Sequence, residues 1–255
     1  MIQMKLWVVV FLLGTLAACA STPKELEKER KDKEAAEINV QLASGYMRRG
    51  DLEVAEEKLK KAIEFDRKHV PAYTTLAVLM TMIDKPVEAE NYYLEALDID
   101  SRDPQLHNNY GTFLCSIKKY EEATKQFELT LRNQFYQTPE VAHANLGYCL
   151  LQADNPDYKK IERHLRKALK LRSNMPSAML AMAELGLATK RYLMARAYTQ
   201  RFHSVSAATS HSLWVQINAE HALGDKVYFL KISQRLLKEF PESEEAEKLM
   251  ELSNL

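Results

Sequence analysis

A 34-residue period runs through the chain and restricts its fold more than any other feature of the sequence. Ala55, Ala89 and Ala123 are 34 residues apart, and Ala62 and Ala96 repeat the same spacing. A period of this size is typical of repeat architectures, in which each helical unit buries one face against its neighbours. The period therefore predicts an array of helical hairpins stacked in sequence order.

Six units fit the period, with starts near residues 36, 70, 104, 140, 176 and 210. Two extra residues lie in each of the loops 134–139 and 154–158, where they leave the helix registers intact. The period, together with small residues where two helices would cross, resembles the tetratricopeptide repeat. The resemblance predicts an all-α fold, a right-handed superhelical solenoid of six tetratricopeptide repeats over residues 36–241. An amphipathic stretch over 242–255 is expected to form a C-terminal capping helix.

Composition agrees with a helical body and excludes other classes. The 255 residues include only 7 Gly and 8 Pro, too few for the turns of a β-sandwich or barrel. Pro71, Pro104, Pro139 and Pro176 stand at repeat openings, where a helix tolerates proline. Because 35 Lys and Arg balance 35 Asp and Glu, we expect no nucleic acid among the partners.

The N-terminus is typical of a secretory signal. Lys5 precedes an apolar run over 6–13, and small residues lead to Cys19. The ending Leu-Ala-Ala-Cys resembles the bacterial lipobox, which implies that residues 1–18 are removed and that Cys19 is lipidated. A plain signal peptide with a chance cysteine is the alternative. Several acyl chains would make a stable anchor.

The residues after Cys19 suggest where the anchor resides. Ala20 and Ser21 follow it, and the Asp that usually retains such lipoproteins in the inner membrane is absent. By that resemblance we expect the outer membrane, on its periplasmic face. Residues 19–35 are strongly charged and cannot bury a core, so they are expected to form a lipidated polar tether that becomes helical toward residue 37.

In the tetratricopeptide geometry, the first helix of each repeat lines a concave groove. The predicted groove residues carry apolar and amide side chains with few charges, which suits an extended or helical protein segment. The alternative is that some of them pack against neighbouring repeats. These residues are Val78, Met82, Asn108, Thr112, Tyr148, Leu151 and Trp214.

No pattern of residues predicts an enzyme. The chain has no Gly-rich phosphate loop, no nucleophile elbow and no metalloprotease helix, so we expect no cofactor. His211 and His221 could approach each other in the groove, but no carboxylate or thiol stands at a metal-ligand spacing. A metal-binding accessory of a periplasmic hydrolase remains a third, separate hypothesis.

Two further cysteines lie on the first helices of neighbouring repeats. Cys115 and Cys149 occupy positions twelve and ten of repeats three and four. In an oxidising periplasm such a pair is a candidate disulfide, and the alternative is two buried thiols. The choice depends on the Cα separation, which the sequence leaves open.

The phrases around these cysteines carry a more specific resemblance. Residues 107–115 (HNNYGTFLC), 145–149 (NLGYC) and 135–139 (FYQTP) resemble the type IV pilus biogenesis lipoproteins, the PilF/PilW pilotins. The resemblance covers essentially the whole chain and departs at 154–157, where that family tends to have a short glycine turn. It implies a monomeric outer-membrane lipoprotein that binds the pilus secretin and promotes its localisation and multimerisation. The alternative is a tetratricopeptide scaffold of another envelope machine, for outer-membrane protein insertion or peptidoglycan synthesis.

Overall fold

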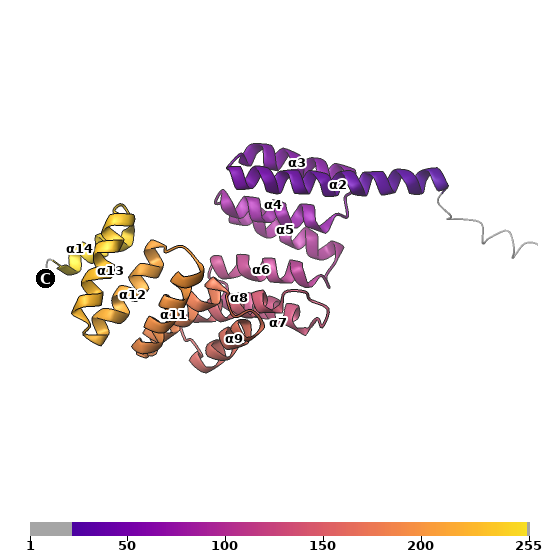
Figure 1. Ribbon diagram of the computed structural model, residues 1–255. Helices are drawn as coiled ribbons and strands as arrows, with labels where there is room; N and C mark the ends of the chain where they lie inside the picture. The colour runs from indigo at the N-terminus through magenta and orange to yellow at the C-terminus, as the bar shows by residue number, and fades with distance from the viewer. Residues whose placement is uncertain (1–21, 254–255) are drawn as a thin grey trace, which may run out of the picture. The chain divides into compact units, whose positions relative to one another are not determined.

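A computed structural model describes residues 22–253, and every regular element in that range is an α-helix. The expected signal peptide over 1–18 and the expected lipidation site Cys19 lie outside the described residues. The helices are α2 (Pro23–Arg49), α3 (Leu52–Phe65), α4 (Val70–Met82), α5 (Pro86–Ile99), α6 (Pro104–Ser116), α7 (Tyr120–Arg132), α8 (Pro139–Leu151), α9 (Tyr158–Leu171), α10 (Pro176–Ala188), α11 (Tyr192–Val205), α12 (Ser210–Leu223), α13 (Lys226–Glu239) and α14 (Glu244–Ser253). They pair into six hairpins followed by α14 (Figure 1), so the predicted all-α repeat fold is confirmed.

Proline and a left-handed turn mark the two ends of the first helices. Five of them have proline at N1 or N2, namely α2, α4, α6, α8 and α10. Just past their C-termini the chain adopts positive φ, at Gly50 and Gly224 and also at three non-glycine residues. Asp84, Lys118 and Lys190 occupy this turn with φ between 56° and 62°, a region that costs energy for a side chain with a Cβ.

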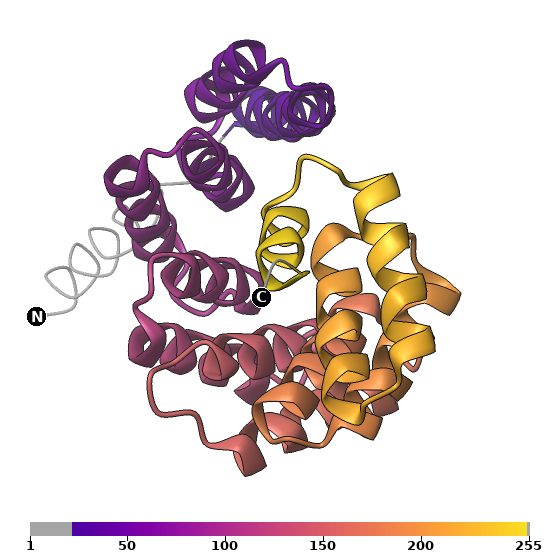
Figure 2. The same cartoon turned by 90° about the vertical axis from the view of Figure 1, so that its left-hand side faces the viewer.

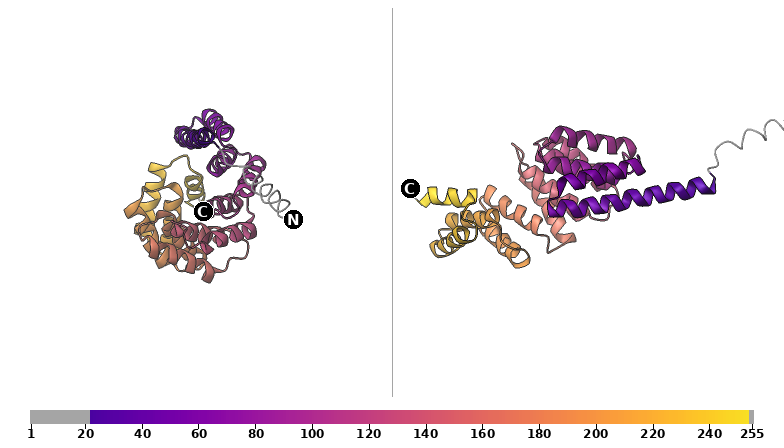
Figure 3. Two further views of the ribbon diagram at one scale, coloured as in Figure 1. Left: turned by 90° about the vertical axis from the view of Figure 1, so that its right-hand side faces the viewer. Right: turned by 90° about the horizontal axis from the view of Figure 1, so that it is seen from above.

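The helices form two compact units, which divide between Asp100 and Ser101. In the first unit α2 has 27 residues and extends past α3 (Figure 3, right). Its first buried residue is Ala36, and Asn39, Val40 and Ala43 follow on the same face. The packed part of this helix therefore begins where the first repeat was expected to begin.

The stretch expected to be a polar tether is helical from Pro23, well before residue 37. Thr22 and Glu25 form a capping box in which the Glu25 N–H donates to Thr22 Oγ1 and the Thr22 N–H donates to Glu25 Oε2. Lys31 and Lys33 each pair with a glutamate four residues earlier, at 2.9 and 2.7 Å. A capped run of Glu, Lys and Arg satisfies its own backbone, so it needs no core to be helical.

In the second unit the apolar side chains gather in clusters between successive hairpins. One cluster joins repeats four and five and contains Leu165, Met179, Met182 and Phe202. Another closes the C-terminal end, where Ala246 and Leu249 of α14 pack against α12 and α13. A short loop leads from α13 to α14 (Figure 2, yellow), and α14 covers the end of the array as a capping helix does.

Small residues bring the paired helices close together. A Cβ added at Gly186 of α10 would lie 2.7 Å from the backbone nitrogen of Ala195 in α11, so only glycine fits there. Within residues 22–253 no helix combines the length and the apolar character that crossing a membrane requires.

Candidate protein-binding site

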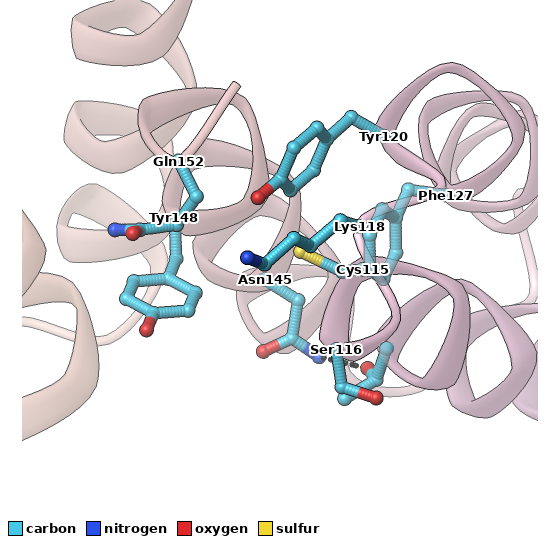
Figure 4. A pocket seen from close by; sticks show the side chains of 9 residues that line it. Cys115, Ser116, Lys118, Tyr120, Phe127, Asn145, Tyr148 and Gln152 are labelled. Atoms are coloured by element: carbon cyan, nitrogen blue, oxygen red, sulfur yellow. Dashed lines mark hydrogen bonds between the residues drawn. The ribbon is translucent and has the colours of Figure 1, made fainter. Parts of the chain in front are cut away.

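A pocket of about 340 Å³ opens between the hairpins of repeats three and four (Figure 4). Its walls come from α6, from the turn and helix that follow it, and from α8. The residues that line it are Thr112, Cys115, Ser116, Lys118, Tyr120, Phe127, Asn145, Tyr148 and Gln152. Two predicted groove residues, Thr112 and Tyr148, are among them.

The pocket combines an apolar base with a polar rim. Phe127 is fully buried beneath it, whereas the Tyr148 ring is 49% exposed. In Figure 4 the Tyr120 hydroxyl points toward the side that Tyr148 and Gln152 form. Partial burial raises the pKa of Tyr148, so its phenol stays neutral at physiological pH. Neutral hydroxyl and amide groups around an apolar floor suit a polypeptide segment that buries one apolar side chain.

An amide on α8 links the two repeats at this site. Asn145 Nδ2 donates to Asn108 Oδ1 and to Thr112 Oγ1, both at 3.3 Å. Asn108 itself is only 4% exposed, so its expected place on the groove surface is wrong. The hydrogen bond that Asn145 donates to Asn108 Oδ1 makes this burial possible, because it satisfies the amide oxygen away from solvent. Asn108 thus supports the wall of the pocket.

A disulfide joins Cys115 of α6 to Cys149 of α8, with a Cα–Cα distance of 5.7 Å. This separation lies in the usual range for disulfides. Cys149 is fully buried and Cys115 is half-buried in the pocket wall. The bridge therefore ties together the two helices whose spacing sets the width of the pocket.

Comparison with known proteins identifies the family. No protein-family model matches the chain. Over 221 residues the chain is 33% identical to the type IV pilus assembly protein PilF of Pseudomonas aeruginosa, covering 86% of this chain and 87% of that protein. The chain belongs to the PilF family of type IV pilus assembly proteins.

Two solved structures agree with membership of the PilF family. The structure of Pseudomonas aeruginosa PilF matches with a TM-score of 0.74 and 30% identity, covering 86% of this chain and 98% of that one. The structure of PilW, a widely conserved type IV pilus biogenesis factor, matches with a TM-score of 0.78 and 25% identity, covering 84% and 98%. In this member of the PilF family, the pocket and the disulfide lie in the repeats whose sequence carries the resemblance.

The remaining predicted groove residues do not line this pocket. Val78 and Met82 belong to α4 in the first unit, where Val78 is half-buried and Met82 is 54% exposed. Leu151 packs against the cluster of repeats four and five, and Trp214 packs against the C-terminal cluster. The first-helix positions from which the groove was predicted therefore include both exposed residues and residues that pack against apolar clusters.

Some lining residues lie outside the repeat positions from which the groove was predicted. Asn145 is at the sixth position of its repeat, and Lys118, Tyr120 and Phe127 belong to the turn and second helix of repeat three. One usable signal was Asn109, which stands at the same position as Asn145 in the preceding repeat.

The histidines take up structural roles. His211 Nε2 lies 2.6 Å from Glu184 Oε1, and His221 packs against the Phe229 ring. His143 and His164 share a 2.9 Å hydrogen bond between their Nδ1 atoms. No group of three or more metal-ligating side chains gathers anywhere in residues 22–253.

Proposed function

We propose that this protein is an outer-membrane lipoprotein of the type IV pilus pathway, a pilotin that binds the secretin subunit. Its proposed role is non-enzymatic and promotes outer-membrane localisation and multimerisation of the secretin. The observation that carries the proposal is the 33% identity to PilF over 86% of the chain. The lipobox-like ending at Cys19 supports the anchor, and the pocket of repeats three and four supports partner binding.

The proposed mechanism uses the pocket as a clamp for one segment of the secretin. An apolar side chain of that segment enters above Phe127, and the amides of Asn145 and Gln152 hydrogen-bond its main chain. The lipid on Cys19 holds the complex at the membrane. Confining several subunits to one surface raises their effective concentration, which favours assembly over misassembly.

Truncation of the exposed aromatic residue tests the binding site. Tyr148→Ala should weaken secretin binding about tenfold, because aromatic anchors in pockets carry a large share of binding energy. Leu193→Ala provides the control, since Leu193 is 67% exposed on α11 and does not line the pocket. Titration of the purified secretin measures both. Equal affinities for the two variants would place the binding site elsewhere on the protein.

The anchor and the pathway need tests in the cell. Cys19→Ala should leave soluble protein and mislocalised secretin, whereas recovery of this variant in the outer membrane would refute the lipid anchor. A deletion strain should lose twitching and secretin multimers. Intact multimers together with depleted outer-membrane barrel proteins would instead support the scaffold of another envelope machine.

A further inference from the structure

The second helix of repeat four carries an unusually one-sided charge. Six of the fourteen residues of α9 are Lys or Arg, and Glu162 is its one acid. The second helices of repeats one to three differ, whereas α11 has two cations and no acid, and α13 has four cations and one acid. In α3, Lys60 pairs with Glu56 at 2.6 Å, and α5 carries four acids and no cation. Among the second helices α9 therefore carries the largest excess of cations, in a chain that has no net charge.

Four of the six cations of α9 share the face that points away from the core. Ile161, Leu165 and Ala168 are fully buried on one side of the helix. Spacings of four, four and three residues place a second set on the opposite side, where all of its members are exposed. This basic stripe consists of Lys159, Arg163, Lys167 and Lys170.

The glutamates near α9 are paired with other cations, and Asp157 accepts the backbone N–H groups of Lys159 and Lys160 at the start of the helix. Glu128 binds Lys160 at 3.2 Å, and Glu162 binds Arg166 at 2.6 Å and Arg191 at 2.8 Å. In the described part of the chain no ion pair involves a member of the basic stripe. Like charges at this spacing repel one another, so an external anionic surface would stabilise them.

We propose that the basic stripe of α9 is a contact surface for anionic phospholipid headgroups. The four cations extend over about 16 Å of helix and none of them lines the pocket of repeats three and four. Such a stripe offers charge density without a recess, which suits a fluid array of headgroups better than a shaped peptide. Leu171, 52% exposed next to the stripe, adds an apolar contact. This inference rests on the proposed function in one respect, because the proposed lipid anchor is what brings the protein close to a membrane.

Vesicle sedimentation of the full chain carrying Cys19→Ala tests the inference. Each Lys or Arg near an anionic surface strengthens adsorption roughly fivefold, so neutralising all four should weaken binding to phosphatidylglycerol-containing vesicles by more than about tenfold. Phosphatidylcholine vesicles should show no such change, and high salt should remove the difference. The stripe variant combines Lys159→Gln, Arg163→Gln, Lys167→Gln and Lys170→Gln.

A matched control removes the same charge from scattered exposed positions. It combines Lys61→Gln, Lys85→Gln, Lys125→Gln and Lys226→Gln, and it should lose no more than about threefold in affinity. Replacing the three stripe lysines by arginine should preserve binding and show that charge, not folding, is measured. Equal losses in stripe and control variants would overturn the proposal. So would failure of the parent chain to prefer phosphatidylglycerol, including the case in which it binds an acidic protein instead.

Secretin titration of the stripe variant separates this inference from the proposed function. We expect unchanged secretin affinity, because the stripe lies outside the pocket. Loss of secretin binding with vesicle binding retained would refute the lipid surface and assign α9 to the secretin interface. Conversely, normal vesicle behaviour in a protein that never binds secretin would leave the stripe intact and reject the pilotin role.

Discussion

Repeats three and four are joined by a covalent bond, whereas repeats five and six are joined by charged side chains. The Cys115–Cys149 bridge connects the first pair. In the second pair, Arg196 of α11 donates to Glu220 of α12, which is fully buried, and to Asp225 at 3.1 Å. Similar hairpins can thus be coupled by different kinds of bond. Reductant breaks the disulfide between repeats three and four, whereas loss of charge breaks the ion pairs between repeats five and six.

Removing the disulfide should have the largest effect on this contrast. The bridge closes a loop of 34 residues, so Cys115→Ala with Cys149→Ala should lower the free energy of unfolding by about 4 kcal/mol. Urea unfolding with and without reductant measures the change. Reductant should destabilise the parent chain and leave the double variant unaffected, which separates the bond from the small volume lost with the thiols. A parent chain indifferent to reductant would contradict the prediction.

Breaking the ionic coupling should have a somewhat smaller effect. Arg196→Met leaves Glu220 buried without its cation, and we expect a loss of about 3 kcal/mol that reductant does not change. Arg201→Met on the same helix is the control, because Arg201 is exposed against Tyr198. Replacing Arg196 and Glu220 together by Met should recover much of the loss. Equal effects at Arg196 and Arg201 would show that the buried carboxylate needs no partner.

Acidification should also distinguish the disulfide-linked repeats three and four from the ion-paired repeats five and six. Burial lowers the pKa of His143 and of His164 in repeat four to about 4, and Lys167 acts in the same direction. Because their pKa is lower in the folded state, their contribution is complete above the unfolded value of about 6.5 and is lost as the pH falls toward 4. We expect the stability of repeat four to fall by roughly 2 kcal/mol per histidine between pH 7 and pH 5. Hydrogen exchange in α8 and α9 measures it, and His143→Gln with His164→Gln should flatten the dependence.

His211 in repeat six should respond with the opposite sign. The hydrogen bond that His211 donates to Glu184 raises the pKa of His211, and Glu245 lies 3.8 Å away on the other side. The nearby Lys248 opposes this shift. His211 therefore contributes its full stabilisation below the pKa of the unfolded state. This stabilisation is lost as the pH rises through the raised pKa of the folded state. Exchange in α12 and α14 that accelerates on acidification would contradict this sign.

The smallest expected effect on stability should be equal in the disulfide-linked pair of repeats and in the ion-paired one. Lys118 and Lys190 occupy equivalent turns with φ of 62° and 57°. Lys118→Gly and Lys190→Gly should each stabilise the protein by about 0.5 kcal/mol, because relief of the left-handed strain exceeds the entropy that glycine loses. The reverse change, Gly224→Lys, should destabilise it by a similar amount in urea unfolding. Unequal effects at the two lysines would mean that packing, and not backbone strain, controls the turn.

Much of the fold was predictable because its determinants are local. Pro71, Pro104 and Pro176 stand in the first turns of their helices, and the recurring alanines, such as Ala89 and Ala123, are fully buried. The long start of α2 was missed because a buried core was taken as the condition for helix formation, whereas a cap and charge pairs are sufficient at Thr22.

The candidate site was less predictable, because it depends on how neighbouring hairpins stack. Thr112 and Tyr148 were placed in the pocket by their positions in the repeat. Asn108 has an equally suitable position, yet it is buried by Asn145 from the next repeat. Tyr120 and Phe127 were missed because a second helix contributes to the wall.

Spacing along the chain was sufficient to predict an all-α array of helical repeats and the small residues at the helix crossings. These follow from spacing along one chain, which a 34-residue period records directly. Three properties became visible only in the folded molecule: which groove positions stay exposed, the 5.7 Å between the Cα atoms of Cys115 and Cys149, and the lack of ion pairs along the basic stripe of α9 within the described residues. Those properties depend on the angle and distance between successive hairpins. Side chains from several repeats set these together, and no single period encodes them.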